Sequence, residues 1–575
     1  MTLPRVGPAA MSSARRAAPE FQTKWWRDAI IYQIGVAGFQ DSDGDGFGDL
    51  AGVVERLDYI ESLGVDAIWL TPFYISPFDD YGYDITDHVD VDSRFGSLAE
   101  FDRLVELVHQ RGLKLILDMV WNHTSDQHPW FRDSAASREG RYADWYVWAD
   151  PAPGGGPPNN WRSAFTGDSG WKYVDARKQY YFFNFLHTQP DLNWHNPDVR
   201  RMVLDCAKFW LNRGIDGMRL DAVNFYTHDP QLRDDPVRKK GAPMPDGMDP
   251  ENPAAQHCFV NSFCREETLQ YLEPLRALVD QYPGVMMLGE VTLCEDTLQQ
   301  AAQYVRGQHR LHLAYHSALH FHEPTSAARL RAILEKALRN YGPHGICWIV
   351  GNHDYGRTRS YWGGRDGPLP EAFYHMIAAL LVTLPGAFCL WQGDELGLPD
   401  ARIPEDIPKS RLQDPFGKLM YPKIKGRDGS RTPMPWRDDQ RLCGFSSADD
   451  SWLPIPDSHR KRAVSRQEPD PGSLLNRWRK LLHWRRTQAA LNGGETRVIE
   501  LDDDAVLGFE RHSPQQALLC LFNQTGREVS VDLSRYARPR GAQGIEHGFE
   551  IDPVSERLLL RPWGTAFAEI DAQPA

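Results

Sequence analysis

Acidic residues stand at the ends of several short apolar segments of this 575-residue chain. Asp118 ends the segment KLILD, Asp221 ends GMRLD, Glu290 ends MMLGE, and Asp354 follows ICWIVGNH. A single carboxylate of this kind has an ordinary explanation, because acidic side chains often cap helices or pair with arginine. Gathering four of them is costly, and a fold keeps that cost where the charges do chemistry. Two carboxyl groups on opposite sides of a sugar ring suit glycosidic bond cleavage.

The neighbours of these carboxylates suggest their roles. Arg219 lies two residues before Asp221 on the same strand face, and we expect it to hold Asp221 ionised as a nucleophile. The apolar context of Glu290 favours its protonated form, as a general acid requires. Asp354, with His123 and His353, could bind sugar hydroxyls. Metal binding by these histidines is the alternative, but they lack the spacing of metal ligands.

Eight apolar, β-rich segments separated by helical patterns must position these residues. They are continuous apolar runs, as expected of strands buried on both faces, and eight such units predict a closed (β/α)8 barrel of the TIM type. Asn196-Pro197 predicts the start of a helix over Asp198–Arg213, which Gly214 ends. The predicted strands are Ala29–Ile34, Ala67–Leu70, Lys114–Val120, Gly217–Val223, Met286–Val291, Leu311–Tyr315, Ile346–Val350 and Ala387–Trp391.

The remaining segments divide the chain into domains. Residues 1–22 have the composition of a disordered leader, and residues 23–122 hold the first part of the barrel. A long stretch rich in Gly, Pro and aromatic residues, 123–195, predicts an inserted domain, after which 196–492 complete the barrel. Residues 493–575 alternate short apolar strands with turns, which predicts an antiparallel β-sandwich.

Composition excludes several classes of partner. The net charge of −14 disfavours nucleic acid and anionic membrane surfaces. The eight cysteines form no CxxC pair, and no apolar run is long enough to span a membrane. We therefore expect a cytoplasmic enzyme, monomeric or homodimeric, that acts on small neutral substrates and needs no organic cofactor.

Four ordered segments resemble the sequence regions of the α-amylase superfamily, glycoside hydrolase family 13. They are DMVWNH (118–123), GMRLDAV (217–223), LGEV (288–291) and VGNHD (350–354), and the resemblance runs from about Trp26 to the C-terminus. It implies a (β/α)8 domain with an inserted domain B and a C-terminal β-sandwich domain C. It also implies that Asp221 is the nucleophile, Glu290 the acid/base and Asp354 the transition-state stabiliser. The residues implied to line the subsite for the cleaved glucose are Arg219, His123 and His353.

Two further segments resemble the oligo-1,6-glucosidase and α-glucosidase branch of that family. They are DDYGYDITD (79–87) and GRDGSRTPMPW (426–436). The resemblance implies that Asp80 and Tyr83 hold the terminal glucose and that Arg427 pairs with Asp80, which closes the pocket for exo-action. Phe165 and Phe185 match the aromatic walls of that pocket. The small Ala222 after the nucleophile implies a preference for α-1,4 linkages.

The segment DSDGDGFGDL (41–50) resembles the first part of a calcium loop. The expected ligands of a structural Ca²⁺ or Mg²⁺ are Asp41, Asp43, Asp45, the Phe47 carbonyl and Asp49. An acidic surface turn is the alternative interpretation.

These features predict an exo-acting retaining α-glucosidase that cleaves short α-1,4-glucosides such as maltose and transfers glucose to alcohols or sugars. The alternatives are trehalose synthase, which isomerises maltose, or another glucosyltransferase or isomerase of the same branch. A non-enzymatic transporter subunit is disfavoured, because all three catalytic carboxylates are present and a membrane helix is not.

Overall fold

A computed structural model describes most of the chain. It covers residues 20–239, 241–242, 244–245, 253–321, 324–342, 345–363, 369–404, 406–422, 426–533, 540–542, 545, 547–551 and 557–570. The predicted leader falls outside the described residues up to residue 19, and its last three residues open the 3-10 segment η1 (Glu20–Asp28).

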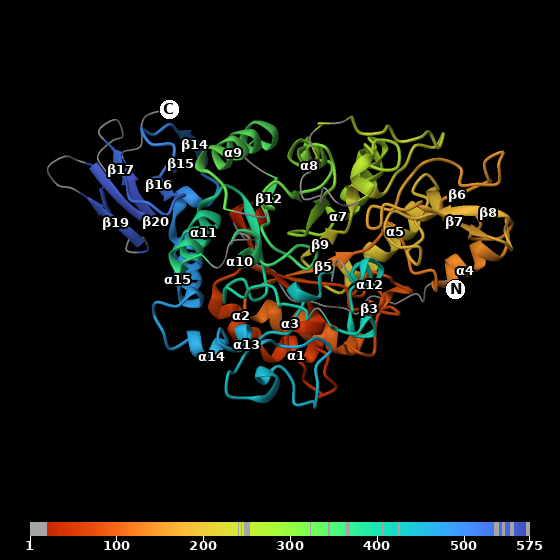
Figure 1. Cartoon of the computed structure of the whole chain (residues 1–575), viewed down its shortest axis with the longest axis horizontal. Helices are drawn as coiled ribbons and strands as arrows, with labels where there is room; N and C mark the ends of the chain where they lie inside the picture. The colour runs from red at the N-terminus through yellow and green to blue at the C-terminus, as the bar shows by residue number, and fades with distance from the viewer. Residues whose placement is uncertain are drawn as a thin grey trace.

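Eight parallel strands close into a barrel at the centre of the molecule (Figure 1). All eight predicted strands are present, and the predicted TIM-type barrel is confirmed; most differences in length are of one to three residues at an end. Around the barrel the order is β1-β13-β12-β11-β10-β9-β5-β2. The strands are β1 (Ile30–Ile34), β2 (Ala67–Leu70), β5 (Lys114–Met119), β9 (Gly217–Leu220), β10 (Met286–Val291), β11 (Leu313–His316), β12 (Ile346–Trp348) and β13 (Ala387–Trp391).

Helices lie between and around these strands. The predicted helix after Asn196 is α5 (Pro197–Asn212), one residue earlier at each end than expected, and the Asn196 side chain caps it by accepting a bond from Asp198 N. The others are α1 (Leu50–Glu55), α2 (Leu57–Leu63), α3 (Leu98–Gln110), α4 (Pro129–Ala136), α6 (Glu267–Tyr271), α7 (Glu273–Val279), α8 (Thr297–Val305), α9 (Ala327–Tyr341), α10 (Thr358–Tyr361), α11 (Glu371–Thr383), α12 (Pro415–Met420), α13 (Asp457–Arg460), α14 (Val464–Gln467) and α15 (Leu474–Thr487).

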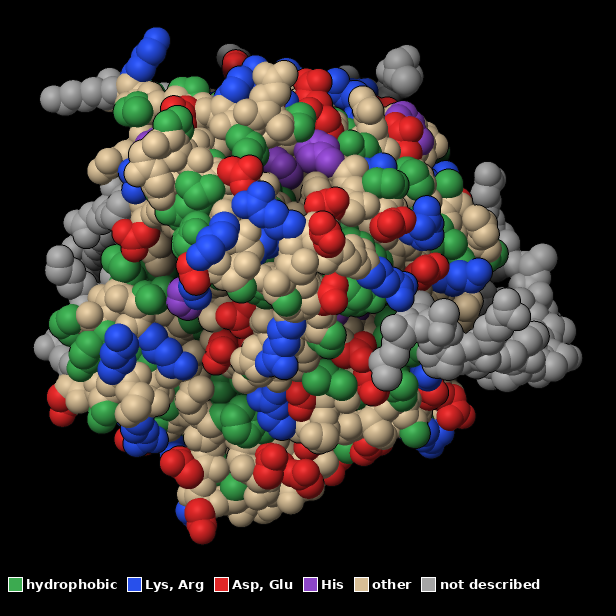
Figure 2. Space-filling view, turned by 90° about the vertical axis from the view of Figure 1, so that its right-hand side faces the viewer, with side chains coloured by type: hydrophobic (Ala, Val, Ile, Leu, Met, Phe, Trp, Pro, Cys, Tyr) green, Lys and Arg blue, Asp and Glu red, His purple; other side chains and the backbone are tan. Residues whose placement is uncertain are grey.

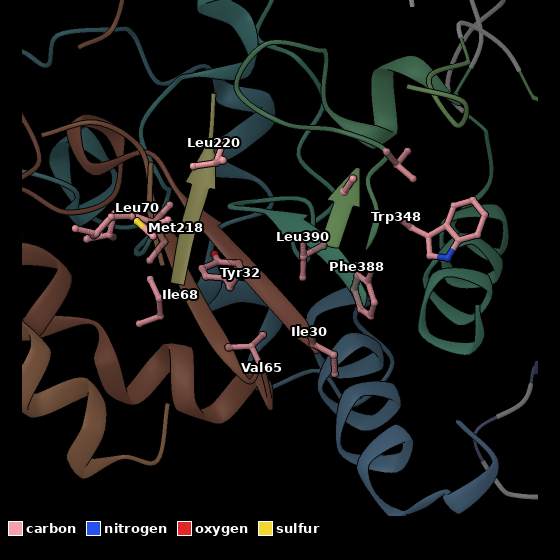
Figure 3. Close-up of a cluster of buried hydrophobic side chains, with 14 of the residues drawn as sticks. Ile30, Tyr32, Val65, Ile68, Leu70, Met218, Leu220, Trp348, Phe388 and Leu390 are labelled. Carbon is pink, nitrogen blue, oxygen red and sulfur yellow. The ribbon is translucent and has the colours of Figure 1, made fainter. Parts of the chain in front are cut away.

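Alternate residues of most barrel strands enter two different cores. Ile30 and Tyr32 of β1 and Leu70 of β2 belong to the cluster that Figure 3 shows, which extends to the helices. Ile31 and Trp69 belong to a separate cluster inside the barrel. Successive side chains of a strand point to opposite faces, so both faces here are buried and the strands are apolar throughout. The polar exceptions at the strand ends are therefore conspicuous.

Two smaller sheets lie outside the barrel, and the three-stranded one is at the end of the molecule opposite the C-terminal strands (Figure 1). Between β5 and α5, a three-stranded antiparallel sheet has the order β6-β8-β7, from β6 (Trp148–Ala149), β7 (Trp171–Val174) and β8 (Gln179–Phe182). It lies within the predicted insertion 123–195, whose boundaries remain a prediction. A two-stranded sheet joins β3 (Tyr74–Ile75) to β4 (Asp87–Val91). Acidic and basic side chains are interspersed over the face that carries the three-stranded sheet (Figure 2).

The C-terminal strands are antiparallel, as expected of the predicted β-sandwich, and the described strands are joined in one sheet. They are β14 (Glu495–Ile499), β15 (Val506–His512), β16 (Ala517–Asn523), β17 (Val529–Asp532), β18 (Arg540–Ala542), β19 (His547–Ile551) and β20 (Arg557–Ile570). All seven are joined in one sheet through β20, which pairs with β17 and β19 mainly along its first part and with β16 and β18 along its second. Trp563, between the two parts, has a left-handed φ of 58°. Among the described residues, no helix combines the length and apolar character needed to cross a membrane.

Candidate active site

The barrel register brings the charged strand ends together. Asp118 on β5 and Arg219 on β9 are register partners, and Leu288 is the partner of Arg219 on β10. Glu290 lies two residues beyond Leu288 and pairs in register with Tyr315 on β11. Because side chains two residues apart on a strand share a face, Glu290 and Tyr315 form a layer next to that of Asp118 and Arg219.

Arg219 is the centre of this arrangement. Its Nη1 donates to Asp118 at 2.6 Å and to Asp221 at 2.7 Å, and its Nη2 donates to Glu290 at 2.5 Å. The Ala222 backbone N–H also donates to Glu290, at 2.9 Å, from a left-handed turn with φ of 44°. One guanidinium group thus holds the two predicted catalytic carboxyl groups in fixed positions beside each other.

The predicted charge state of Asp221 requires a correction. Burial raises the pKa of Asp221 well above its usual range, and Arg219, which lowers it, is opposed by the charges of Glu290 and Asp118. The expectation that Arg219 alone keeps Asp221 ionised left out this burial and the two other carboxylates. One cation among three buried carboxylates leaves excess negative charge, so Asp221 loses its proton at a higher pH than an exposed carboxyl group does.

Asp118 is a member of the site for which no role was predicted from the sequence. It is buried and accepts hydrogen bonds from Tyr83 Oη at 2.8 Å and from Trp69 Nε1 at 3.1 Å, in addition to the bond from Arg219. Its position at the end of β5 was the signal. Asp118 therefore connects the predicted substrate residue Tyr83 to the Arg219 cluster.

A second arginine cluster surrounds Asp354. Arg427 Nη1 donates to Asp354 at 2.6 Å, and its Nη2 donates to Asp80 at 2.9 Å and to Asp414 at 2.7 Å. Burial opposes ionisation of Asp354, but His353, Arg427 and Arg431 lower the pKa of Asp354 well below its usual range. The predicted pair of Asp80 and Arg427 is present. Asp414 was missed, because its sequence surroundings mark it only as the residue that caps α12.

The two predicted histidines lie on either side of Tyr83. The His353 ring stacks on the Tyr83 ring with centroids 5.1 Å apart, and Gln33 Nε2 lies 2.7 Å from its Nδ1. His123 Nε2 lies 3.1 Å from the Tyr83 carbonyl oxygen, which accepts its N–H. Burial lowers the pKa of His123 to about 3, so this ring is neutral.

The predicted pocket walls also meet. The rings of Phe165 and Phe185 have centroids 5.2 Å apart, and the Arg427 guanidinium lies over the Phe165 ring at 5.0 Å. Ala222 belongs to an apolar cluster that includes Phe225 and Phe263. The aromatic walls, the second arginine cluster and the residue after Asp221 are therefore contiguous.

The acidic loop after β1 gathers three of its predicted ligands. Single carboxylate oxygens of Asp41, Asp43 and Asp49 lie within 4.8 Å of one another. Among the described residues, Asp45 does not join this group, and its carboxylate accepts the Phe47 backbone N–H at 2.8 Å. Asp43 has a raised pKa, first from burial and then from the charge of Asp45. Hard oxygen donors with unbalanced negative charge fit Ca²⁺ or Mg²⁺.

Comparison with known proteins agrees with this geometry. The model of the α-amylase catalytic domain matches residues 33–494. The chain belongs to the α-amylase family. A probable α-glucosidase of Rhizobium meliloti (strain 1021) is 42% identical over 554 residues, covering 95% of this chain and 97% of that one. An oligo-1,6-glucosidase of Parageobacillus thermoglucosidasius is 32% identical over 558 residues, covering 94% and 98%.

Two solved structures superpose on nearly the whole chain. The α-glucosyl transfer enzyme XgtA superposes with a TM-score of 0.88 at 42% identity, covering 95% of this chain and 100% of that one. The trehalulose synthase MutB of Pseudomonas mesoacidophila MX-45 superposes with a TM-score of 0.79 at 29% identity, covering 97% and 100%. This member of the α-amylase family is a glycoside hydrolase.

Proposed function

We propose that this enzyme is an exo-acting retaining α-glucosidase for short α-1,4-glucosides such as maltose, with glucosyl transfer to alcohols or sugars as a second outcome. The observation that carries the proposal is the Arg219 guanidinium, which bonds the carboxyl groups of both Asp221 and Glu290. In a retaining enzyme one carboxylate attacks the sugar while a neighbouring carboxyl group protonates the leaving oxygen. The Arg219 guanidinium fixes the positions of both carboxyl groups, so that one can act as the nucleophile and the other as the acid.

The reaction proceeds in two displacements. Asp221 attacks C1 of the glucosyl unit and forms an ester bond, while the bond from C1 to the leaving oxygen breaks and that oxygen takes the proton of Glu290. Glu290, now a carboxylate, removes a proton from water or from an acceptor hydroxyl. The oxygen of that nucleophile then forms a bond to C1 and releases Asp221. Asp354, kept ionised by its cationic neighbours, stabilises the positive charge that develops on the ring.

The second arginine cluster supports exo-action. Asp80 is buried, bonded to Arg427 at 2.9 Å and to Gln189 Nε2 at 3.0 Å. Such an immobilised carboxylate can bind hydroxyls of one terminal glucose, and a glucan chain could not continue past this ion pair. The small Ala222 leaves room beside the nucleophile, which supports the α-1,4 preference.

The isomerase alternative also has support, from the likeness to the trehalulose synthase MutB. An isomerase would return the glucosyl unit to a new hydroxyl of the same leaving sugar. Both reactions use the same Asp221 and Glu290 chemistry, so products distinguish them and the catalytic residues do not.

We also propose that Asp41, Asp43 and Asp49 hold a structural Ca²⁺ or Mg²⁺. The ion would offset two of the three negative charges in the loop that precedes α1 and supply no catalytic step. The cytoplasmic location and the monomeric or homodimeric state remain predictions from the sequence.

Proton NMR of the purified enzyme with maltose tests the proposed function. We expect α-glucose as the early product, with transfer products at high maltose concentration. If trehalose or another disaccharide accumulates with little free glucose, the enzyme is an isomerase and not a hydrolase. Asp221→Asn should lower turnover by about four orders of magnitude or more. The matched control is Asp216→Asn, which changes a buried carboxylate just before the start of the same strand. Asp216 bonds to His109 and Lys114, and the variant enzyme should turn over maltose as fast as wild type.

A further inference from the structure

Tyr315 is a partner of Arg219 that the reaction described above does not use. Its side chain is fully buried on β11, and its hydroxyl oxygen accepts bonds from Arg219 Nε at 3.1 Å and Nη2 at 2.6 Å. Neither the apolar pattern of β11 nor the carboxylates at the strand ends pointed to it.

These two bonds complete the donor capacity of Arg219. A guanidinium group has five N–H donors. The two of Nη1 go to Asp118 and Asp221, the two of Nη2 go to Glu290 and Tyr315, and the one of Nε goes to Tyr315. Each donor has an acceptor, and the Tyr315 oxygen serves two of them, so the plane of the group cannot turn without breaking bonds.

The edge formed by Nε and Nη2 commonly holds a carboxylate with two parallel bonds. Here a neutral oxygen occupies that edge, because burial raises the pKa of Tyr315 well above its usual range. A fourth carboxylate would share the positive charge and weaken its attraction to the others. The phenol satisfies two donors and leaves the charge of Arg219 to Asp118, Asp221 and Glu290.

Register explains why Tyr315 suits this task. It is the direct neighbour of Glu290 on the adjacent strand, one layer beyond Arg219. In this position the Tyr315 hydroxyl keeps Nη2 of Arg219 next to Glu290, while Nη1 of Arg219 remains between Asp118 and Asp221.

We propose that Tyr315 is a positioning residue, whose hydroxyl fixes the Arg219 guanidinium in the one orientation that serves both Asp221 and Glu290. The inference rests on the proposed roles of these two carboxyl groups. Tyr315→Phe removes only the hydroxyl and leaves two buried N–H donors without acceptors. We expect kcat to fall about tenfold to one hundredfold, with KM nearly unchanged because the change acts on the orientation of Arg219 between the two catalytic carboxyl groups.

The pH profile separates positioning from a merely structural role. Arg219 lowers the pKa of Asp221, so a misplaced guanidinium raises that pKa and shifts the acid limb of kcat/KM to higher pH. The charged and titratable groups that face this cluster are Asp118, Asp221, Glu290, Tyr83, Tyr226 and Asp354. All of them are unchanged in the variant.

The experiment measures kcat, KM and pH profiles on maltose and on 4-nitrophenyl α-glucoside. Tyr146→Phe is the matched control, since it removes a buried hydroxyl that is bonded to Thr124 at 2.8 Å and lies outside the Arg219 cluster. A kcat within about twofold of wild type and an unmoved acid limb in Tyr315→Phe would overturn the inference.

If Tyr315→Phe does not fold, as judged by circular dichroism, 3-fluorotyrosine at position 315 decides. It keeps the ring and the hydroxyl but weakens the oxygen as an acceptor, so a smaller shift in the same direction is expected and an unchanged profile overturns the inference. A wild-type enzyme that turns over neither substrate removes the proposed function and this inference with it. An active wild type with an unaffected variant removes only the role of Tyr315.

Discussion

Arg427→Ala tests whether the second arginine cluster is needed to bind the glucosyl unit. The side chain of Arg427 is 14% exposed and contacts three carboxylates, those of Asp80, Asp354 and Asp414, at 2.9, 2.6 and 2.7 Å. The alanine variant removes the cation and leaves the three carboxylates facing one another. Arg431 remains 3.2 Å from Asp354, and its charge also lowers the pKa of Asp414.

The magnitude follows from the burial of these groups. Removing one partner of a buried ion pair costs about 3–5 kcal/mol, because the remaining charge loses its compensation. Part of this loss falls on stability and part on the arrangement of Asp80 and Asp354 around the sugar. We expect kcat/KM to fall about one hundredfold or more, since about 3 kcal/mol of transition-state stabilisation corresponds to that factor.

Acid stability should change in a defined direction. The pKa of Asp354 lies well below its usual range, partly because of Arg427. A carboxyl group with a lowered folded-state pKa contributes stability above its unfolded-state pKa and loses it as the pH falls through the folded-state value. Arg427→Ala brings the pKa of Asp354 up, so acid unfolding of the variant should begin at higher pH than in wild type.

Steady-state kinetics on 4-nitrophenyl α-glucoside and acid unfolding followed by circular dichroism measure both effects. Arg437→Ala is the matched control, because its pair with Asp439 is exposed on both sides, 53% and 62%, and such pairs contribute little. A folded Arg427→Ala enzyme with kcat/KM within about threefold of wild type refutes the reasoning.

Three further changes have defined outcomes. Ala222→Val should lower the ratio of maltose to isomaltose turnover, because it fills space beside the nucleophile; an unchanged ratio contradicts the proposed linkage preference. Glu290→Gln should slow maltose far more than 4-nitrophenyl α-glucoside, whose leaving group needs less protonation, and equal losses would argue against Glu290 as the acid. Chelation should lower the melting temperature of the wild-type enzyme more than that of Asp41→Asn, because the variant has already lost a ligand. If the wild-type enzyme keeps its melting temperature after verified metal removal, it binds no structural ion at this loop.

The sequence was sufficient to predict the barrel fold because each strand is marked by a local run of apolar residues. Each barrel strand is apolar on both faces, so even the short Leu313–His316 could be located from its composition. The carboxylates at the strand ends were equally visible, because Asp118, Asp221 and Glu290 interrupt these apolar runs. Their assigned roles depended on the resemblance to the α-amylase superfamily, since spacing alone does not distinguish a nucleophile from an acid.

What the sequence missed depends on contacts between distant segments. Asp414 lies 13 residues from Arg427 in sequence, and nothing in its neighbourhood distinguishes it from an ordinary helix cap. Tyr315 looks like one more core aromatic of β11 until the barrel register places it beside Glu290. The pKa of Asp221 was judged from Arg219 alone, because the opposing carboxylates come from other strands.

The two arginine clusters share one physical property, which links the charge balance to the proposed reaction. In each, a single guanidinium group faces three carboxylates from distant parts of the chain: Arg219 faces Asp118, Asp221 and Glu290, and Arg427 faces Asp80, Asp354 and Asp414. The negative charge in excess of the cation raises the pKa of Asp221 in the first cluster. The excess negative charge also stabilises the transition state, in which C1 of the sugar becomes positive, more than it stabilises the neutral substrate. Only such differential stabilisation lowers the barrier. A fully neutralised site could hold glucose equally well and would lose both effects.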